Sequence, residues 1–89
     1  MYRDISILID SDIQFRKLHN QIFKTNKNLI KDVALFDVFE GGSIPENKKS
    51  YGISIKIQDV NKTLNEVEID RVMQNIIQML EKEFDAKLR

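Results

Sequence analysis

The sequence predicts an α+β fold, a ferredoxin-like sandwich in which an antiparallel sheet carries two helices on one face and keeps the opposite face open. One observation behind this prediction is the order of the patterns along the chain: strand, helix, strand, strand, helix and short strand. Another is the alternation of apolar and polar residues at positions 53–58, which gives the sheet one dry and one wet face. The length of 89 residues, 42% of them hydrophobic, suits a single domain that covers residues 1–89.

The first strand and the first helix follow each other within residues 5–28. Residues 5–9 are rich in β-branched side chains that alternate between two faces, which is typical of a strand. Residues 10–12 (Asp-Ser-Asp) offer side-chain oxygens that can cap a helix starting near Ile13. Residues 25–28 (Thr-Asn-Lys-Asn) end this helix, and its apolar face consists of Phe15, Leu18 and Ile22.

The second strand, residues 29–39, can take two registers. One places Val33, Leu35, Asp37 and Phe39 under the helices, and the other places Ala34, Phe36 and Val38 there. Hydrophobicity hardly separates the two. We choose the first because it fills more volume in the core and lets Asp37 reach Arg3 or a loop amide. In this register Phe36 points to the open face.

The connection from Glu40 to Ser50 is long for a hairpin, and it contains Gly41, Gly42 and Pro45. Connections of this length in small domains are more often functional or mobile than merely connecting. This one presents two cations, Lys48 and Lys49. The third strand follows at residues 53–57.

The second helix has the stronger signals. Asn65 is the predicted cap, Glu68 occupies the acidic position of a capping box, and Glu66 and Asp70 complement the helix dipole. Residues 86–89 then form a minimal edge strand. The apolar stripe of the helix consists of Ile69, Val72, Met73, Ile76, Leu80 and Phe84.

Composition excludes several function classes. The absence of cysteine rules out disulfides, thiolate nucleophiles and zinc–thiolate sites, and the single histidine, His19, rules out histidine-rich metal sites. We therefore expect no metal site, and we place His19 on the surface. Apolar runs are too short for a membrane span or a signal peptide, so a cytoplasmic location is expected. With 14 basic and 14 acidic residues, any attraction to nucleic acid must come from a local patch.

Five segments together resemble the ferredoxin-fold anticodon-binding domain at the C-terminal end of the bacterial phenylalanyl-tRNA synthetase β subunit. They are residues 2–5 (Tyr-Arg-Asp-Ile), 35–39 (Leu-Phe-Asp-Val-Phe), 48–50 (Lys-Lys-Ser), 63–66 (Thr-Leu-Asn-Glu) and 80–89, which begin Leu-Glu-Lys-Glu-Phe. The chain departs from the family pattern at three positions. Phe39 replaces a tyrosine, and Asn47 and Asp85 replace glycines, although both tolerate positive φ better than most residues.

The resemblance implies a non-catalytic tRNA-binding module of a class II ligase whose α subunit uses ATP and magnesium, with no cofactor in this domain. The implied partners are the anticodon arm of phenylalanine tRNA, the rest of the β subunit and the α subunit. The open face agrees with this implication, since polar and cationic side chains beside an aromatic platform suit splayed RNA bases. The predicted RNA-binding residues are Phe36, Lys48, Lys49, Ser54, Lys56, Gln58 and Arg89.

Two other functions stay open. An enzyme of the acylphosphatase kind would hold phosphate with Arg16, but Asp10 and Asp12 would repel an anion at that helix end. A protein-interaction or small-ligand regulatory domain would instead use an apolar open face that includes Leu8, Phe36 and Val38. Without the resemblance, Lys48 and Lys49 would be taken as an ordinary solvated loop.

Overall fold

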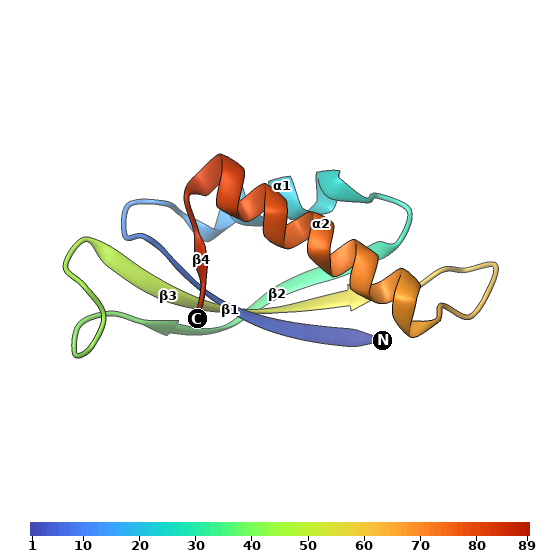
Figure 1. Ribbon diagram of the computed structural model, residues 1–89, viewed down its shortest axis with the longest axis horizontal. Coiled ribbons are helices and arrows are strands. Elements are labelled where there is room, and N and C mark those ends of the chain that lie inside the picture. The colour runs from blue at the N-terminus through green and yellow to red at the C-terminus, as the bar shows by residue number, and fades with distance from the viewer.

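The computed structural model describes residues 1–89 and has the predicted architecture, with two helices on one face of a four-stranded sheet (Figure 1). The strand order in the sheet is β2-β3-β1-β4, and all paired strands are antiparallel. The face of the sheet opposite the helices is uncovered. The elements are β1 (Tyr2–Asp10), α1 (Phe15–Thr25), β2 (Ile30–Phe39), β3 (Lys48–Ile57), α2 (Glu66–Phe84) and β4 (Lys87–Leu88).

The core lies between the sheet and the helices, and it confirms the predicted strand and helix periodicities. Ile53, Ile55 and Ile57 of β3 are at most 1% exposed, as a period-two strand requires. Leu18 and Ile22 of α1 are fully buried. From α2 the buried side chains are Ile69, Val72, Met73, Ile76 and Leu80.

The start of α1 differs from the prediction. The helix begins at Phe15, and Gln14 occupies the N-cap position without a side-chain hydrogen bond. Asp10 does not cap α1 because it is the last residue of β1, where its carboxylate accepts a hydrogen bond from Lys48 at 2.6 Å. The start of α2 agrees with the prediction, since the Asn65 side chain accepts from the Glu68 amide at 2.8 Å.

β-bulges in β2 decide its register. The pairing of β2 with β3 shifts between Leu35 and Asp37, so Phe36 and Asp37 together lie opposite Gly52. Before this shift Val33 faces the core and is 4% exposed. After the shift the alternation reverses, so Phe39 lies opposite Ser50 on the open-face side.

The predicted burial of the second strand is therefore only partly correct. Val33 is in the core, but Leu35 is 36% exposed and Phe39 is 53% exposed. Val38, which was expected on the open face, pairs with Tyr51 and so lies on the helix side. Asp37 does not reach Arg3, whose guanidinium pairs with Glu66 at 2.8 Å. The bulge explains the positions of Val38 and Phe39, because one extra residue moves every later side chain to the other face. Leu35 comes before the bulge and stays on the helix side, but it is partly exposed because β2 is an edge strand.

Two residues that replace family glycines adopt the conformation that glycine favours. Asn47 has a φ of 67° and Asp85 has a φ of 53°, both in the left-handed region. Asp85 ends α2, and its own backbone amide bonds back to the Leu80 carbonyl. The prediction that the backbone geometry survives these substitutions is confirmed.

Replacing Asp85 with glycine is expected to raise the free energy of unfolding by about 1 kcal/mol, because glycine has no Cβ to strain in the left-handed region. It also removes an acidic side chain from the negative end of the α2 dipole. Urea denaturation of the two proteins measures the difference. Glu83→Gly, two positions earlier inside α2, is the control and should lower stability by up to about 1 kcal/mol. A loss of stability in Asp85→Gly would contradict the prediction.

Candidate nucleic-acid interface

The pairing of the strands defines which side chains share the open face. In β3 the residues that alternate with the buried isoleucines are Lys48, Ser50, Gly52, Ser54 and Lys56. Each lies opposite a residue of β1 on the same face. These β1 partners are Asp10, Leu8, Ser6, Asp4 and Tyr2.

The Phe36 ring lies next to Gly52 of the inner strand β3. A Cβ built on Gly52 would come within 2.8 Å of ring atoms Cε1 and Cζ of Phe36, so only glycine leaves room for the ring at this position. The Phe36 side chain is nevertheless 56% exposed. The prediction that Phe36 points away from the core is confirmed.

A second aromatic ring joins Phe36 on this face. Phe39 and Leu8 are the neighbours of Ser50 on its two sides, and Ser50 is only 2% exposed although it belongs to the open face. We call Phe36, Phe39 and Leu8 the aromatic patch. Sequence reasoning placed Leu8 and Phe36 on this face but assigned Phe39 to the core. Only the bulge brings Phe39 here, and the residue types alone carry no signal for it.

Lys48 is not a free cation. Its ammonium lies 2.6 Å from an Asp10 carboxylate oxygen. This hydrogen bond raises the pKa of Lys48 above its ordinary value, and the negative charge of Asp85 adds to the rise. Lys48 also starts β3 and does not lie in the loop as expected. Its contacts with Asp10 connect the end of β1 to the start of β3.

Lys49 lies on the other side of the sheet from Lys48. It pairs with Ile9, a core residue, and its ammonium lies 4.7 Å from the ring centre of Tyr51. The Tyr51 hydroxyl donates to the Ile13 carbonyl on the helix side. The structure therefore does not bring Lys49 to the rim of the open face, because adjacent strand residues point in opposite directions.

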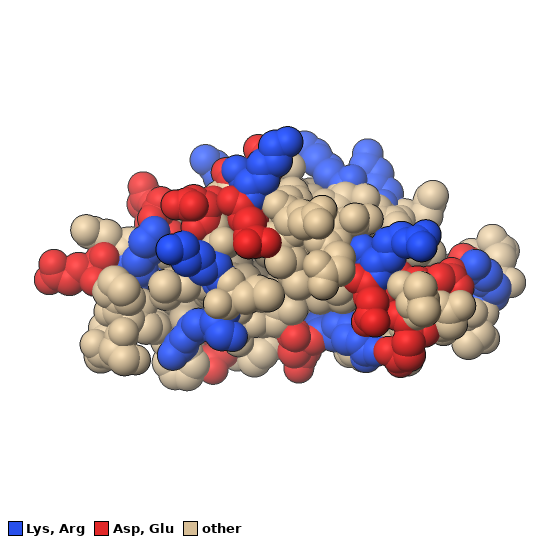
Figure 2. Space-filling view, viewed as in Figure 1, with Lys and Arg blue, Asp and Glu red and all other residues tan.

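Lys56 and Ser54 are at the other end of the open face from Lys48. The Lys56 ammonium lies 5.8 Å from the ring centre of Tyr2, and Asp32 of β2 is its cross-strand neighbour. This half of the face mixes both signs of charge, and Figure 2 shows acidic and basic side chains alternating along the lower edge of the molecule. No large basic field therefore covers the open face.

Arg89 approaches the aromatic patch from the opposite edge. Its backbone amide donates to the Ser6 carbonyl at 2.9 Å. Together with Phe39 and the loop from Glu40 to Ile44, Arg89 lines a hollow of about 290 Å³. Phe39 and Arg89 thus border one hollow, and these residue types suit a nucleotide with its base stacked and its phosphate paired.

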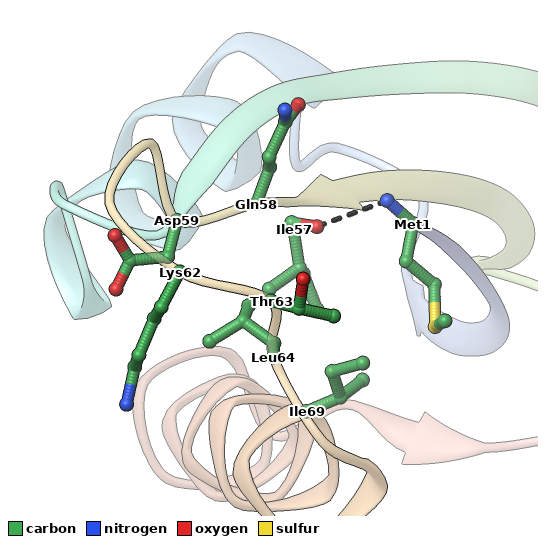
Figure 3. Close-up of a pocket in the computed structure, with 8 residues that line it drawn as sticks. All are labelled: Met1, Ile57, Gln58, Asp59, Lys62, Thr63, Leu64 and Ile69. Carbon is green, nitrogen blue, oxygen red and sulfur yellow. Dashed lines mark hydrogen bonds between the residues drawn. The ribbon is translucent and has the colours of Figure 1, made fainter.

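Gln58 is apart from these residues. It follows β3 and borders a hollow of about 430 Å³ between the end of β3 and the start of α2 (Figure 3). Its side chain points away from Leu64 and Ile69, which form the other wall. The Gln58 amide donates to the Leu29 carbonyl, so its backbone role is to close the sheet at this end.

Three further observations concern metal binding, membrane crossing and His19. No group of three or more His, Asp or Glu side chains is arranged to hold a metal ion, and neither helix has the length and hydrophobicity that crossing a bilayer requires. His19 is half-buried between Phe15 and Phe23 on α1, with ring centroids 6.0 Å and 4.8 Å away. It is thus part of an aromatic stack rather than a freely exposed surface residue.

Comparison with known proteins extends over the whole chain. Residues 1–89 match the family model described as ferredoxin-fold anticodon binding domain. The phenylalanine–tRNA ligase beta subunit of Bacteroides thetaiotaomicron is 42% identical over 87 residues, which are 98% of this chain and 11% of that protein. The beta subunits of Dechloromonas aromatica and Geobacillus kaustophilus are 38% and 37% identical over the same shares. The chain therefore spans about a tenth of the length of these relatives.

Proposed function

The chain belongs to the ferredoxin-fold anticodon binding domain family, and from this premise we propose that it docks the anticodon stem and loop of phenylalanine tRNA on its open sheet face. It would act as the tRNA-binding module of a phenylalanine–tRNA ligase beta subunit. The observation that carries the proposal is the aromatic patch, two exposed rings on the face that no helix covers. Sequence-specific RNA recognition uses such platforms for bases splayed out of a loop.

Stacking supplies most of the affinity in this proposal. A base stacked on an aromatic side chain contributes roughly 1 to 3 kcal/mol. The Phe36 ring lies next to Gly52 and is 56% exposed, so it is accessible to a base. Phe39 and Arg89 border the next position along the face.

Electrostatic attraction contributes less. The net charge of the chain is zero, and Lys48 is already paired with Asp10. Lys56 and Arg89 are the cations best placed to meet phosphates on this face, with Ser54 as a hydrogen-bonding neighbour. Binding by the domain alone should be weak, and it should weaken further as salt rises because each phosphate contact releases counterions.

The chemistry of the ligase would reside elsewhere. We propose that this domain itself is not catalytic and holds no cofactor, and that ATP and magnesium act at the α subunit of the parent ligase. Its protein partners would be the remainder of the beta subunit and the α subunit, in the cytoplasm. The acylphosphatase alternative finds no support, since Arg16 has Asp12 nearby in sequence and no glycine-rich amide loop.

Lys56→Glu is expected to weaken binding of an anticodon stem-loop oligonucleotide by about tenfold while leaving thermal unfolding nearly unchanged, because it reverses a half-exposed charge on the open face. Fluorescence anisotropy between 50 and 200 mM NaCl measures the affinity and its salt dependence. Lys49→Glu is the matched control: it makes the same change on the helix side of β3, and it should cost much less affinity.

The Phe36→Ala variant completes this test. Its affinity for the oligonucleotide should fall roughly tenfold or more, because the stacking contribution is lost. Binding that does not change with salt, or equal losses in Lys49→Glu and Lys56→Glu, would argue against docking on the open face. Concentration-dependent self-association that Phe36→Ala abolishes, without RNA binding, would instead favour the protein-interaction alternative.

A further inference from the structure

The cations of this neutral chain are unevenly distributed, and one group has no role in the proposed docking. Residues 13–31 contain five of the 14 Lys and Arg residues and no acidic residue. All five are exposed, and none belongs to any of the three ion pairs of the structure. We call this group the basic ridge; it consists of Arg16, Lys17, Lys24, Lys27 and Lys31.

The geometry of α1 aligns the ridge. Arg16, Asn20 and Lys24 are spaced four residues apart, so they form one line along the helix, with Lys17 beside it. The buried residues Leu18 and Ile22 are on the opposite side of the helix. At 1.5 Å per residue, the eight steps from Arg16 to Lys24 cover about 12 Å.

A hollow continues the ridge beyond the end of α1. It has a volume of about 470 Å³ and lies between the α1–β2 turn and the loop after β3. Lys27, Asn28 and Lys31 form one side, and Asp59 contributes the single acidic side chain. The ridge thus offers three cations on the helix and two more around a polar hollow.

Helix stability does not account for this arrangement. Arg16 and Lys17 are in the first turn of α1, where positive charge opposes the helix dipole, and no acidic residue offsets them there. The helix also has no N-cap side-chain hydrogen bond, unlike α2 with Asn65. Two cations are therefore kept where they disfavour the fold.

The ridge fits a polyanion better than a protein surface. Stable protein interfaces have an apolar centre with a polar rim, whereas the outward positions 16, 17, 20, 24, 27 and 31 are all polar or charged. Unpaired cations in a row with amide side chains suit the regularly spaced phosphates of nucleic acid. In Figure 2 the upper edge of the helix layer, where Figure 1 shows α1, carries Lys and Arg side chains.

We propose that the basic ridge is a second RNA-binding surface, which holds the phosphodiester backbone of an RNA segment other than the one on the open face. Helix α1 lies above the sheet, so its outward cations Arg16, Lys17 and Lys24 are on the opposite side of the domain from a nucleotide stacked on Phe36. Lys27 precedes β2 and Lys31 is its second residue, and both border the hollow at that end of the sheet. The ridge binds through charge alone and does not discriminate between bases. It requires no contribution from the aromatic patch.

The test uses the 89-residue chain carrying Phe36→Ala and Phe39→Ala, which disables the aromatic patch at two exposed positions. The probe is a fluorescein-labelled 12-nucleotide oligouridylate, and fluorescence anisotropy gives its affinity from 50 to 200 mM NaCl. Arg16→Glu/Lys24→Glu and Lys27→Glu/Lys31→Glu are each added to this background. Arg71→Glu/Lys82→Glu, two exposed cations of α2, is the control with the same change in net charge.

The background protein is expected to keep binding the probe, and each ridge pair should weaken that binding about tenfold or more at 50 mM NaCl. Each pair should also make the slope of log K against log salt shallower by about 1.4, since each contact to a single strand contributes about 0.7. The control pair should change the affinity less than about threefold. Circular dichroism confirms that each variant is folded.

Three results would overturn the proposal. Equal losses in the ridge and control variants would show an effect of net charge alone. If the protein with Phe36→Ala and Phe39→Ala alone did not bind the probe at all, all RNA binding would be on the open face. The proposed anticodon docking would then remain intact. A self-association that only the ridge pairs abolish, with no RNA binding, would assign the ridge to an acidic protein surface. A fourth result would separate the two proposals. If the ridge still bound the probe but Phe36→Ala did not change the affinity for the anticodon stem-loop, the docking proposal would be refuted and the ridge proposal would remain.

Discussion

Removing this domain from the parent ligase is expected to leave ATP-dependent activation of phenylalanine unchanged and to lower kcat/KM for tRNA aminoacylation by about a hundredfold or more. A remote docking module acts through the effective concentration and the orientation of the tRNA acceptor end. The amino-acid activation step does not involve tRNA, so it should not respond. Pyrophosphate exchange measures activation, and transfer of labelled phenylalanine to tRNA measures charging.

The control for this deletion is a ligase that keeps the whole domain but carries Phe36→Ala and Phe39→Ala. Both side chains are more than half exposed, so the variant should fold normally and reproduce most of the charging defect. If activation fell as much as charging in the deletion variant while the enzyme remained assembled, the domain would serve the structure of the ligase rather than tRNA docking. A normal charging rate in the deletion variant would also contradict the proposal.

Ile53→Ala is expected to lower the free energy of unfolding by about 2 to 5 kcal/mol, because it truncates a fully buried side chain in the centre of the core. Small domains have only about 5 to 15 kcal/mol of total stability, so this variant should be partly unfolded at moderate urea concentrations. Chemical denaturation followed by circular dichroism measures the change. The 0% exposure of Ile53 leaves its neighbours little room to relax into the cavity.

Leu35→Ala is the matched control, since Leu35 is the cross-strand partner of Ile53 on the same face of the sheet. From sequence we expected Leu35 to be a core residue with a similar cost. The structure places it on the edge strand at 36% exposure, so the cost should be below about 2 kcal/mol. Equal destabilisation by the two substitutions would mean that the edge of the sheet is as tightly packed as its centre.

Local patterns in the sequence were sufficient to predict the helices, the strands and most of the buried core residues. The period-two isoleucines of β3, the apolar stripe of α2 and the cap at Asn65 each depend on residues within a few positions of one another. Such spacings determine which side chains share a face, whatever the rest of the chain does. The resemblance to the family depended instead on five short sequence segments, and the family match confirmed it.

The tertiary structure alone decided the composition of the candidate site. The bulge at Phe36 and Asp37 depends on a glycine of another strand, Gly52, which leaves space for the ring. That single extra residue moves Phe39 from the core to the open face. Asp10 likewise loses its predicted capping role because Lys48 lies across the sheet from it. Strand register and ion pairing depend on residues far apart in the chain, and no period of two or of 3.6 residues carries that information.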